Sequence, residues 1–74
     1  MKKLLILGAG NYQLPLILKA KEMGVYTIAI SPDGDYPGLK AADKVYYQDA
    51  RDEKKALEVA RLENVDGVTT DKGE

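Results

Sequence analysis

The sequence predicts an α/β fold in which a small parallel sheet carries helices on both faces. Residues 4–7 form an uninterrupted apolar run without the alternation of a half-exposed strand. Such a run is typical of a central parallel strand that is covered on both sides. Gly8-Ala9-Gly10 follows at once and leads into a helical pattern. Stretches of strand and helix character then alternate along the chain, which favours a parallel sheet over an antiparallel one.

Each element has its own signal. The apolar runs predict strands, turn residues predict the loop between the second and third strands, and helical spacing of apolar residues predicts the helices. The expected strands are residues 4–7, 25–30, 44–48 and 67–70. The expected helices run from Asn11 to about Met23 and from residues 49–52 to about Glu63, with a single helical turn at residues 39–42.

The helix ends carry recognisable caps. The Asn11 side chain can accept a free N–H of the first turn. Pro15 fits only near a helix start because it lacks an N–H, and Gly24 is a natural C-terminal cap. An aspartate within residues 49–52 suits the N-terminal dipole of the second helix. That helix is expected to bury Ala56, Leu57, Val59 and Ala60.

The first helix has two apolar stripes where a helix packed on one sheet needs one. The stripes are Leu14, Ile17 and Leu18, and Leu16, Ala20 and Met23. The surplus stripe either covers a flank of the sheet or meets a surface that lies outside this chain, and we favour the second interpretation.

Right-handed crossovers predict the sheet order three-two-one-four, as in a small Rossmann-like sheet. Strands one and four are then neighbours, and the crevice between them is the topological switch point at which α/β proteins bind ligands. The glycine loop lies at the mouth of this crevice.

Composition excludes several function classes. Cysteine and histidine are absent, so the chain offers no thiol nucleophile, no thiolate or imidazole zinc ligand and no histidine base, and we expect no catalytic or metal-binding residues. The formal net charge is -1, without the basic run that nucleic-acid binding requires. No apolar stretch is long enough to span a membrane, so a cytoplasmic protein is expected. With 74 residues the chain is one domain, residues 1–74, which we expect to be part of a longer enzyme.

The candidate binding site follows the first strand. The N–H groups of a glycine turn at a helix start can hold a phosphate or carboxylate, and three polar side chains can orient it. The predicted residues are Gly8, Gly10, Asn11, Tyr12 and Gln13. The structural alternative is that the glycines serve only a sharp turn, Asn11 only caps the helix, Tyr12 packs on a loop and Gln13 lies in solvent.

A nicotinamide-dinucleotide site is the main rival. Its fingerprint has a third glycine where this chain has Gln13, and an acid at the end of the second strand where this chain has Ser31. Asp33 and Asp35 come later and have turn neighbours, which favours turn chemistry over ribose or calcium binding. Asp49, Asp52 and Glu53 are explained by helix capping and surface solvation.

The sequence resembles the N-terminal, pre-ATP-grasp domain of the ATP-grasp ligases. The likeness covers nearly the whole chain: the glycine loop joined to residues 12–15, Pro37-Gly38-Leu39, Ala42-Asp43 before the third strand, and residues 65–68. It points to carbamoyl-phosphate synthase-like, biotin carboxylase-like and purine-biosynthetic members.

The resemblance implies a cytoplasmic, ATP-binding ligase that activates a carboxylate as an acyl phosphate and passes it to a nitrogen nucleophile. It also implies that ATP and magnesium are held by later domains, that this domain serves the acceptor substrate, and that it is inactive alone. The implied partners are those domains and an anionic small molecule.

Two other hypotheses stay open, a minimal NAD- or nucleotide-binding module and a structural fragment without a ligand. We also expect the isolated chain to self-associate through the edge of the fourth strand or the surplus helix stripe, because unpaired edges invite pairing.

Overall fold

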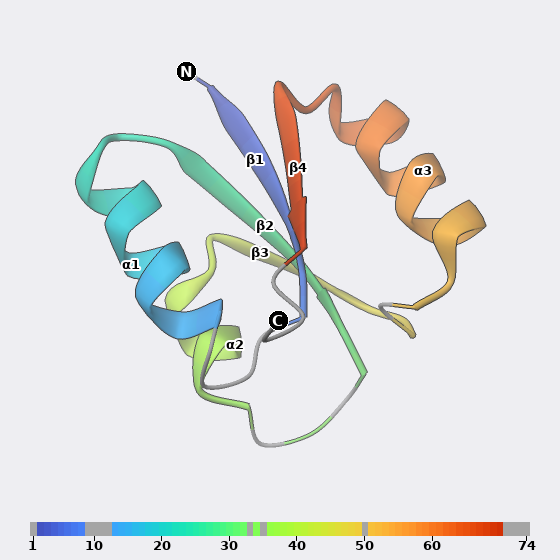
Figure 1. The fold of residues 1–74 in the computed structure, drawn as a ribbon, viewed down its shortest axis with the longest axis horizontal. Helices are drawn as coiled ribbons and strands as arrows, with labels where there is room; N and C mark the ends of the chain where they lie inside the picture. Colours follow the sequence, from blue (N-terminus) through green and yellow to red (C-terminus); the bar gives the residue numbers. More distant parts are fainter. Residues whose placement is uncertain (1, 9–12, 33, 35, 50, 71–74) are drawn as a thin grey trace.

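The computed structural model describes residues 2–8, 13–32, 34, 36–49 and 51–70. Strands and helices alternate along the chain (Figure 1). The strands are β1 (Lys3–Leu7), β2 (Tyr26–Ser31), β3 (Lys44–Tyr47) and β4 (Gly67–Thr70). The helices are α1 (Gln13–Glu22), α2 (Pro37–Ala41) and α3 (Glu53–Glu63).

The strands form one parallel sheet in the order β3-β2-β1-β4, as predicted. In the middle of the sheet Leu5 lies beside Ile28 of β2 and Val68 of β4. The two strands with paired neighbours on both sides, β1 and β2, contain most of the fully buried residues. Their uninterrupted apolar character in the sequence follows from this central position.

Helices cover both faces of the sheet (Figure 1). α1 and α2 contact each other on one face, and α3 lies on the opposite face. Side chains alternate between the faces along each strand, so the α3 side of the sheet carries Leu5, Ile28 and Ile30. These three residues pack with Ala56 and Val59 of α3 into the main core cluster.

The helix ends show the predicted caps. Asp52 precedes α3, and its side chain accepts a hydrogen bond from the N–H of Lys55 at 3.2 Å. Asn64, which was not predicted as a cap, ends α3 in the left-handed conformation with φ of 55°. Gly24 follows α1 with φ of +80°, a conformation that glycine adopts without the steric cost of a side chain. The predicted Asn11 cap lies outside the described residues.

Two expectations about the helices need correction. Leu57 was expected in the core, but 52% of its surface is exposed because α3 turns this residue toward the β4 edge rather than over the centre of the sheet. α1 does not bury one stripe and expose the other: it buries Ile17 from one and Ala20 from the other, which lie three residues apart on one helix face. Leu18 and Met23 are exposed.

The single turn predicted at residues 39–42 is the helix α2, which begins earlier, at Pro37.

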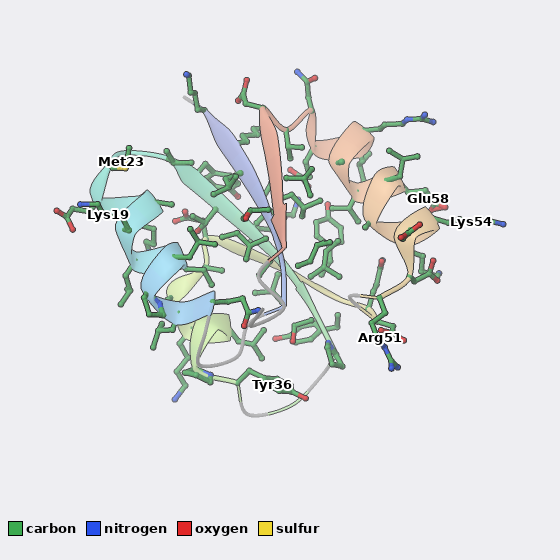
Figure 2. All side chains as sticks on the ribbon, viewed as in Figure 1. Lys19, Met23, Tyr36, Arg51, Lys54 and Glu58 are labelled. Atoms are coloured by element: carbon green, nitrogen blue, oxygen red, sulfur yellow. The ribbon has the colours of Figure 1, made fainter. Side chains whose placement is uncertain are left out.

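The outer helix surfaces are charged. Figure 2 shows Lys54 and Glu58 on α3 and Lys19 on α1, with Met23 directly after the end of α1. The Nζ atom of Lys19 lies 3.9 Å from Oε1 of Glu22. Both partners of this pair are largely exposed, so it adds little to stability.

A polar cluster fixes the C-terminal end of α3 on the sheet. The carboxylate of Glu63 accepts hydrogen bonds from Lys44, at 2.6 Å, and from the hydroxyl of Tyr46. The Glu63 residue is 9% exposed. The hydrogen bonds from Lys44 and then Tyr46 hold the pKa of Glu63 below its ordinary value. These polar contacts join α3 to β3, and the ring of Tyr46 also packs against the core cluster that contains Ala56 and Val59.

Candidate functional site

The carboxyl ends of β1 and β4 lie side by side. Leu7 of β1 pairs with Thr70 of β4, so the chain that leaves β1 at Gly8 starts directly beside the end of β4. This confirms the predicted adjacency of the first and fourth strands. In parallel α/β sheets the space above such a pair is where ligands bind, because the connections leave it in opposite directions.

Gly8 has a structural role that the sequence did not reveal. Its φ of +105° lies in a region that side chains rarely tolerate. Its N–H donates to the carbonyl oxygen of Ile30 at 2.7 Å, which extends the contact between β1 and β2 by one residue. The Gly8 N–H is therefore occupied by the protein and is not available to the predicted anion.

The side chain of Gln13 lies close to Gly8. It is the first residue of α1 and is half-buried, so the alternative that placed it in solvent does not hold. A Cβ atom at position 8 would lie 3.3 Å from Cδ and Nε2 of Gln13. The structure thus brings together two of the five predicted site residues. Gly10, Asn11 and Tyr12 lie outside the described residues.

We expect alanine at Gly8 to cost more stability than alanine at Gly24. Both glycines have positive φ, so each substitution adds backbone strain of about 1–3 kcal/mol. Only the Cβ at position 8 would press on a neighbour, since nothing lies within 4 Å of one at position 24. Urea unfolding of the two variants measures the difference. An equal or larger loss for Gly24→Ala would contradict a tight contact between Gly8 and Gln13.

Two further polar residues end the neighbouring strands. Ser31, the last residue of β2, is 1% exposed, and its hydroxyl donates to the carbonyl oxygen of Pro32 at 3.1 Å. Gln48 follows β3, and its buried Oε1 has no hydrogen-bond partner among the residues that the structure describes. Gln48 was expected as the last residue of the third strand and not as a site residue; a polar amide at the carboxyl end of an otherwise apolar strand is the signal that marks it. Neither residue supplies the acid that would hold a ribose in a nicotinamide site.

The acidic residues near α3 have structural partners. Asp49 accepts from the N–H and guanidinium of Arg51, at 2.9 Å and 3.1 Å, and these bonds hold the pKa of Asp49 below its ordinary value. Asp52 caps α3. Asp33 and Asp35 lie outside the described residues.

No metal centre is visible in the parts of the chain that the structure describes: they contain no group of three or more His, Cys, Asp or Glu side chains suited to an ion. Over the same residues, none of the helices has the length and apolar character needed to traverse a bilayer.

No protein-family model matches the chain. Its curated relatives include formate-dependent phosphoribosylglycinamide formyltransferases, from Bacillus velezensis at 34% identity over 65 residues and from Methanocella arvoryzae at 27% over 66 residues. The matches cover 88% and 89% of this chain but only 17% and 16% of the relatives.

Solved structures also match nearly the whole of this chain and only a small part of the other protein. N5-carboxyaminoimidazole ribonucleotide synthetase from Thermotoga maritima superposes with a TM-score of 0.83 at 30% identity over 96% of this chain and 19% of that one. Phosphoribosylglycinamide synthetase from Anaerococcus prevotii does so with a TM-score of 0.79 at 41% identity over 93% and 18%. The chain matches the N-terminal domain of ATP-grasp ligases. It spans less than a fifth of the length of these relatives.

The comparisons confirm the family resemblance drawn from the sequence. Of the members that the resemblance pointed to, the relatives named above are the purine-type ligases and not carbamoyl-phosphate synthases or biotin carboxylases. The chain therefore corresponds to a small N-terminal part of such ligases and not to a complete catalytic unit.

Proposed function

We propose that this chain is the substrate-side domain of a cytoplasmic ATP-grasp ligase and that it binds the anionic group of the acceptor substrate. The observation that carries the proposal is the position of Gly8, where β1 ends beside β4 at the switch point. The names of the relatives support a substrate with a phosphoribosyl or ribonucleotide moiety, since each names one.

Within the proposed site the residues have separate tasks. Gly8 anchors the loop to β2 through its N–H, and Gln13 rests against Gly8 at the start of α1. Gly10 and the N–H groups near it would hold the anion, while Asn11, Tyr12 and Gln13 would orient the bound molecule. A helix start favours negative charge because its first N–H groups lack intrahelical partners.

The chemistry itself would belong to the domains that are absent from this chain. ATP, with magnesium, would activate a carboxylate there as an acyl phosphate. The domain described here would present a nitrogen nucleophile to it, holding the substrate without moving a proton. No residue of this chain is assigned a catalytic role.

Gly10→Val in a polypeptide that carries all the ligase domains tests this function. Valine lacks the backbone freedom of glycine and adds bulk where the anion would approach. We expect the KM for the acceptor substrate to rise about tenfold or more, while the KM for ATP stays unchanged. Ala9→Gly, a neighbouring change that adds no bulk, is the control. Unchanged acceptor affinity and turnover in Gly10→Val would reject the proposed role of the loop.

The rival functions give different results on the isolated chain. Tight saturable binding of NADH, followed by fluorescence, would favour a dinucleotide module instead. Ser31 argues against it, because its buried hydroxyl is engaged with Pro32. A chain whose melting temperature responds to neither ribose 5-phosphate nor phosphoribosylglycinamide would favour a structural fragment.

A further inference from the structure

The apolar residues of α3 do not by themselves fix which side of the helix meets the sheet. Ala56 and Ala60 lie one turn apart and form a row of small side chains that packs on the core. With about 3.6 residues per turn, Leu57 lies on one side of this row and Val59 on the other. A rotation of α3 about its own axis would therefore keep both alanines on the sheet and exchange Val59 for Leu57.

Apolar burial alone favours the Leu57 side. Leucine has more apolar surface to remove from water than valine. An apolar hollow of about 210 Å³ also lies beside it, between α3 and the strands β1 and β4, and its lining includes Leu7, Leu57 and Val68. Rotation of α3 toward β4 would bring Leu57 into this space. The structure instead buries Val59, which is 3% exposed, and leaves Leu57 52% exposed.

Glu63 lies on the same side of the alanine row as Val59. Its Oε2 atom accepts from Nζ of Lys44 at 2.6 Å and from the hydroxyl of Tyr46. Both donors belong to β3, at the opposite side of the sheet from β4. A rotation that buried Leu57 would lift the Glu63 carboxylate away from β3 and break both hydrogen bonds.

The polar contacts therefore distinguish two orientations that the apolar contacts do not. The attraction within a buried ion pair is largely offset by the cost of removing its charges from water, so its net contribution to stability is small. Hydrogen bonds to a charged group are nevertheless directional. The bonds of Glu63 can form in one orientation of α3 only, whereas Ala56 and Ala60 pack on the sheet in both.

We propose that the Glu63 carboxylate, held by Lys44 and Tyr46, selects the rotational position of α3 on the sheet and keeps Leu57 at the surface. Loss of the carboxylate, or of its two donors, releases α3 to turn toward β4. The connection from α3 to β4 stays in place, because the N–H of Asp66 donates to the carbonyl oxygen of Lys3 at 2.9 Å. The inference goes beyond the proposed function and does not depend on the anion site.

Methyl NMR spectra of the whole chain in the presence of a soluble nitroxide test the proposal. The nitroxide relaxes those methyl groups that solvent reaches, so the relaxation rates of Leu57 and Val59 report which of the two is buried. Ile28 is the internal reference for an intact core, since it is 0% exposed. In the natural chain Leu57 should relax much faster than Val59.

Two variants remove the cluster in different ways. Glu63→Ala deletes the acceptor, and Lys44→Met combined with Tyr46→Phe deletes the donors while keeping the aliphatic stem and the ring. Glu58→Ala is the matched control, because Glu58 is exposed on the same helix (Figure 2) and is not one of these partners.

We expect both variants to raise the relaxation rate of Val59 and to lower that of Leu57, so that their ratio changes severalfold while Ile28 stays slow. Glu58→Ala should leave the ratio as it is. An unchanged ratio in either variant would overturn the proposal, as would the same change in Glu58→Ala. Fast relaxation of Ile28 together with Val59 would overturn it as well, because the cluster would then hold the whole core and not the orientation of one helix. None of these results bears on the Gly10→Val test.

Discussion

Replacing Ile28 with alanine is expected to remove about 2–5 kcal/mol of folding free energy, the range for a buried isoleucine. Ile28 is fully buried in β2, beside Leu5 of β1, and it belongs to the cluster that Ala56 and Val59 of α3 complete. Its loss would leave a cavity between the sheet and α3. A chain of 74 residues has a total stability of about 4–11 kcal/mol, so this one change removes a large share of it.

Urea unfolding monitored by circular dichroism measures this effect. Ile28→Val is the graded variant and should lose only about 0.5–1.5 kcal/mol. Leu18→Ala is the surface control, because Leu18 is 52% exposed on α1 and its truncation leaves no cavity. Similar losses for Ile28→Ala and Leu18→Ala would show that α3 and the sheet do not form a close-packed core.

Removal of the Asp43 carboxylate is expected to have the second large effect. The Oδ2 atom accepts from the N–H of Thr27 at 2.8 Å and from its hydroxyl at 2.9 Å. Thr27 is fully buried, so Asp43→Ala leaves two of its donors without this acceptor. An unsatisfied buried donor costs about 1–3 kcal/mol. Asp49→Ala is the control, since Asp49 pairs locally with the exposed Arg51 and its loss should change stability little.

The Asp43 contribution should depend on pH in a defined direction. The N–H of Thr27, followed by its hydroxyl and the nearby Lys21, holds the pKa of Asp43 below its ordinary value of 3.8. A lowered pKa means that the folded state favours the carboxylate, so the stabilisation is complete above pH 3.8 and is lost as the pH falls through the folded-state pKa. The stability difference between the natural chain and Asp43→Ala should therefore shrink on acidification. A difference that stays constant from neutral pH to strongly acidic pH would contradict this role of the charge.

Most element ends could be predicted because their signals are local, and the strand order could be predicted because parallel connections are right-handed. The apolar run before Gly8, the glycine after α1 and the aspartate before α3 each act within a few residues of the boundary that they mark. The exposure of Leu57 could not be predicted in this way. Four apolar residues crowd one side of α3, and only the position of the helix over the sheet decides which of them faces the β4 edge.

Contacts between residues far apart in the chain could not be predicted from the sequence either. Thr27 and Asp43 are sixteen residues apart, and Glu63 meets Tyr46 across seventeen. In the candidate site, the glycine pattern predicted a turn, and the strand order placed it beside β4. The sequence does not show that the Gly8 N–H donates to the carbonyl oxygen of Ile30 or that Gln13 lies against the same glycine. Both contacts depend on how the first strand and the first helix are placed in space.

The bond between Gly8 and Ile30 has a consequence for how such a domain can diversify. Through this bond the residue that follows β1 is held to β2, and Gln13, the first residue of α1, lies against the same glycine. Under the proposed function, exchanges between these two positions would change which molecule is bound while both contacts keep their place in the fold.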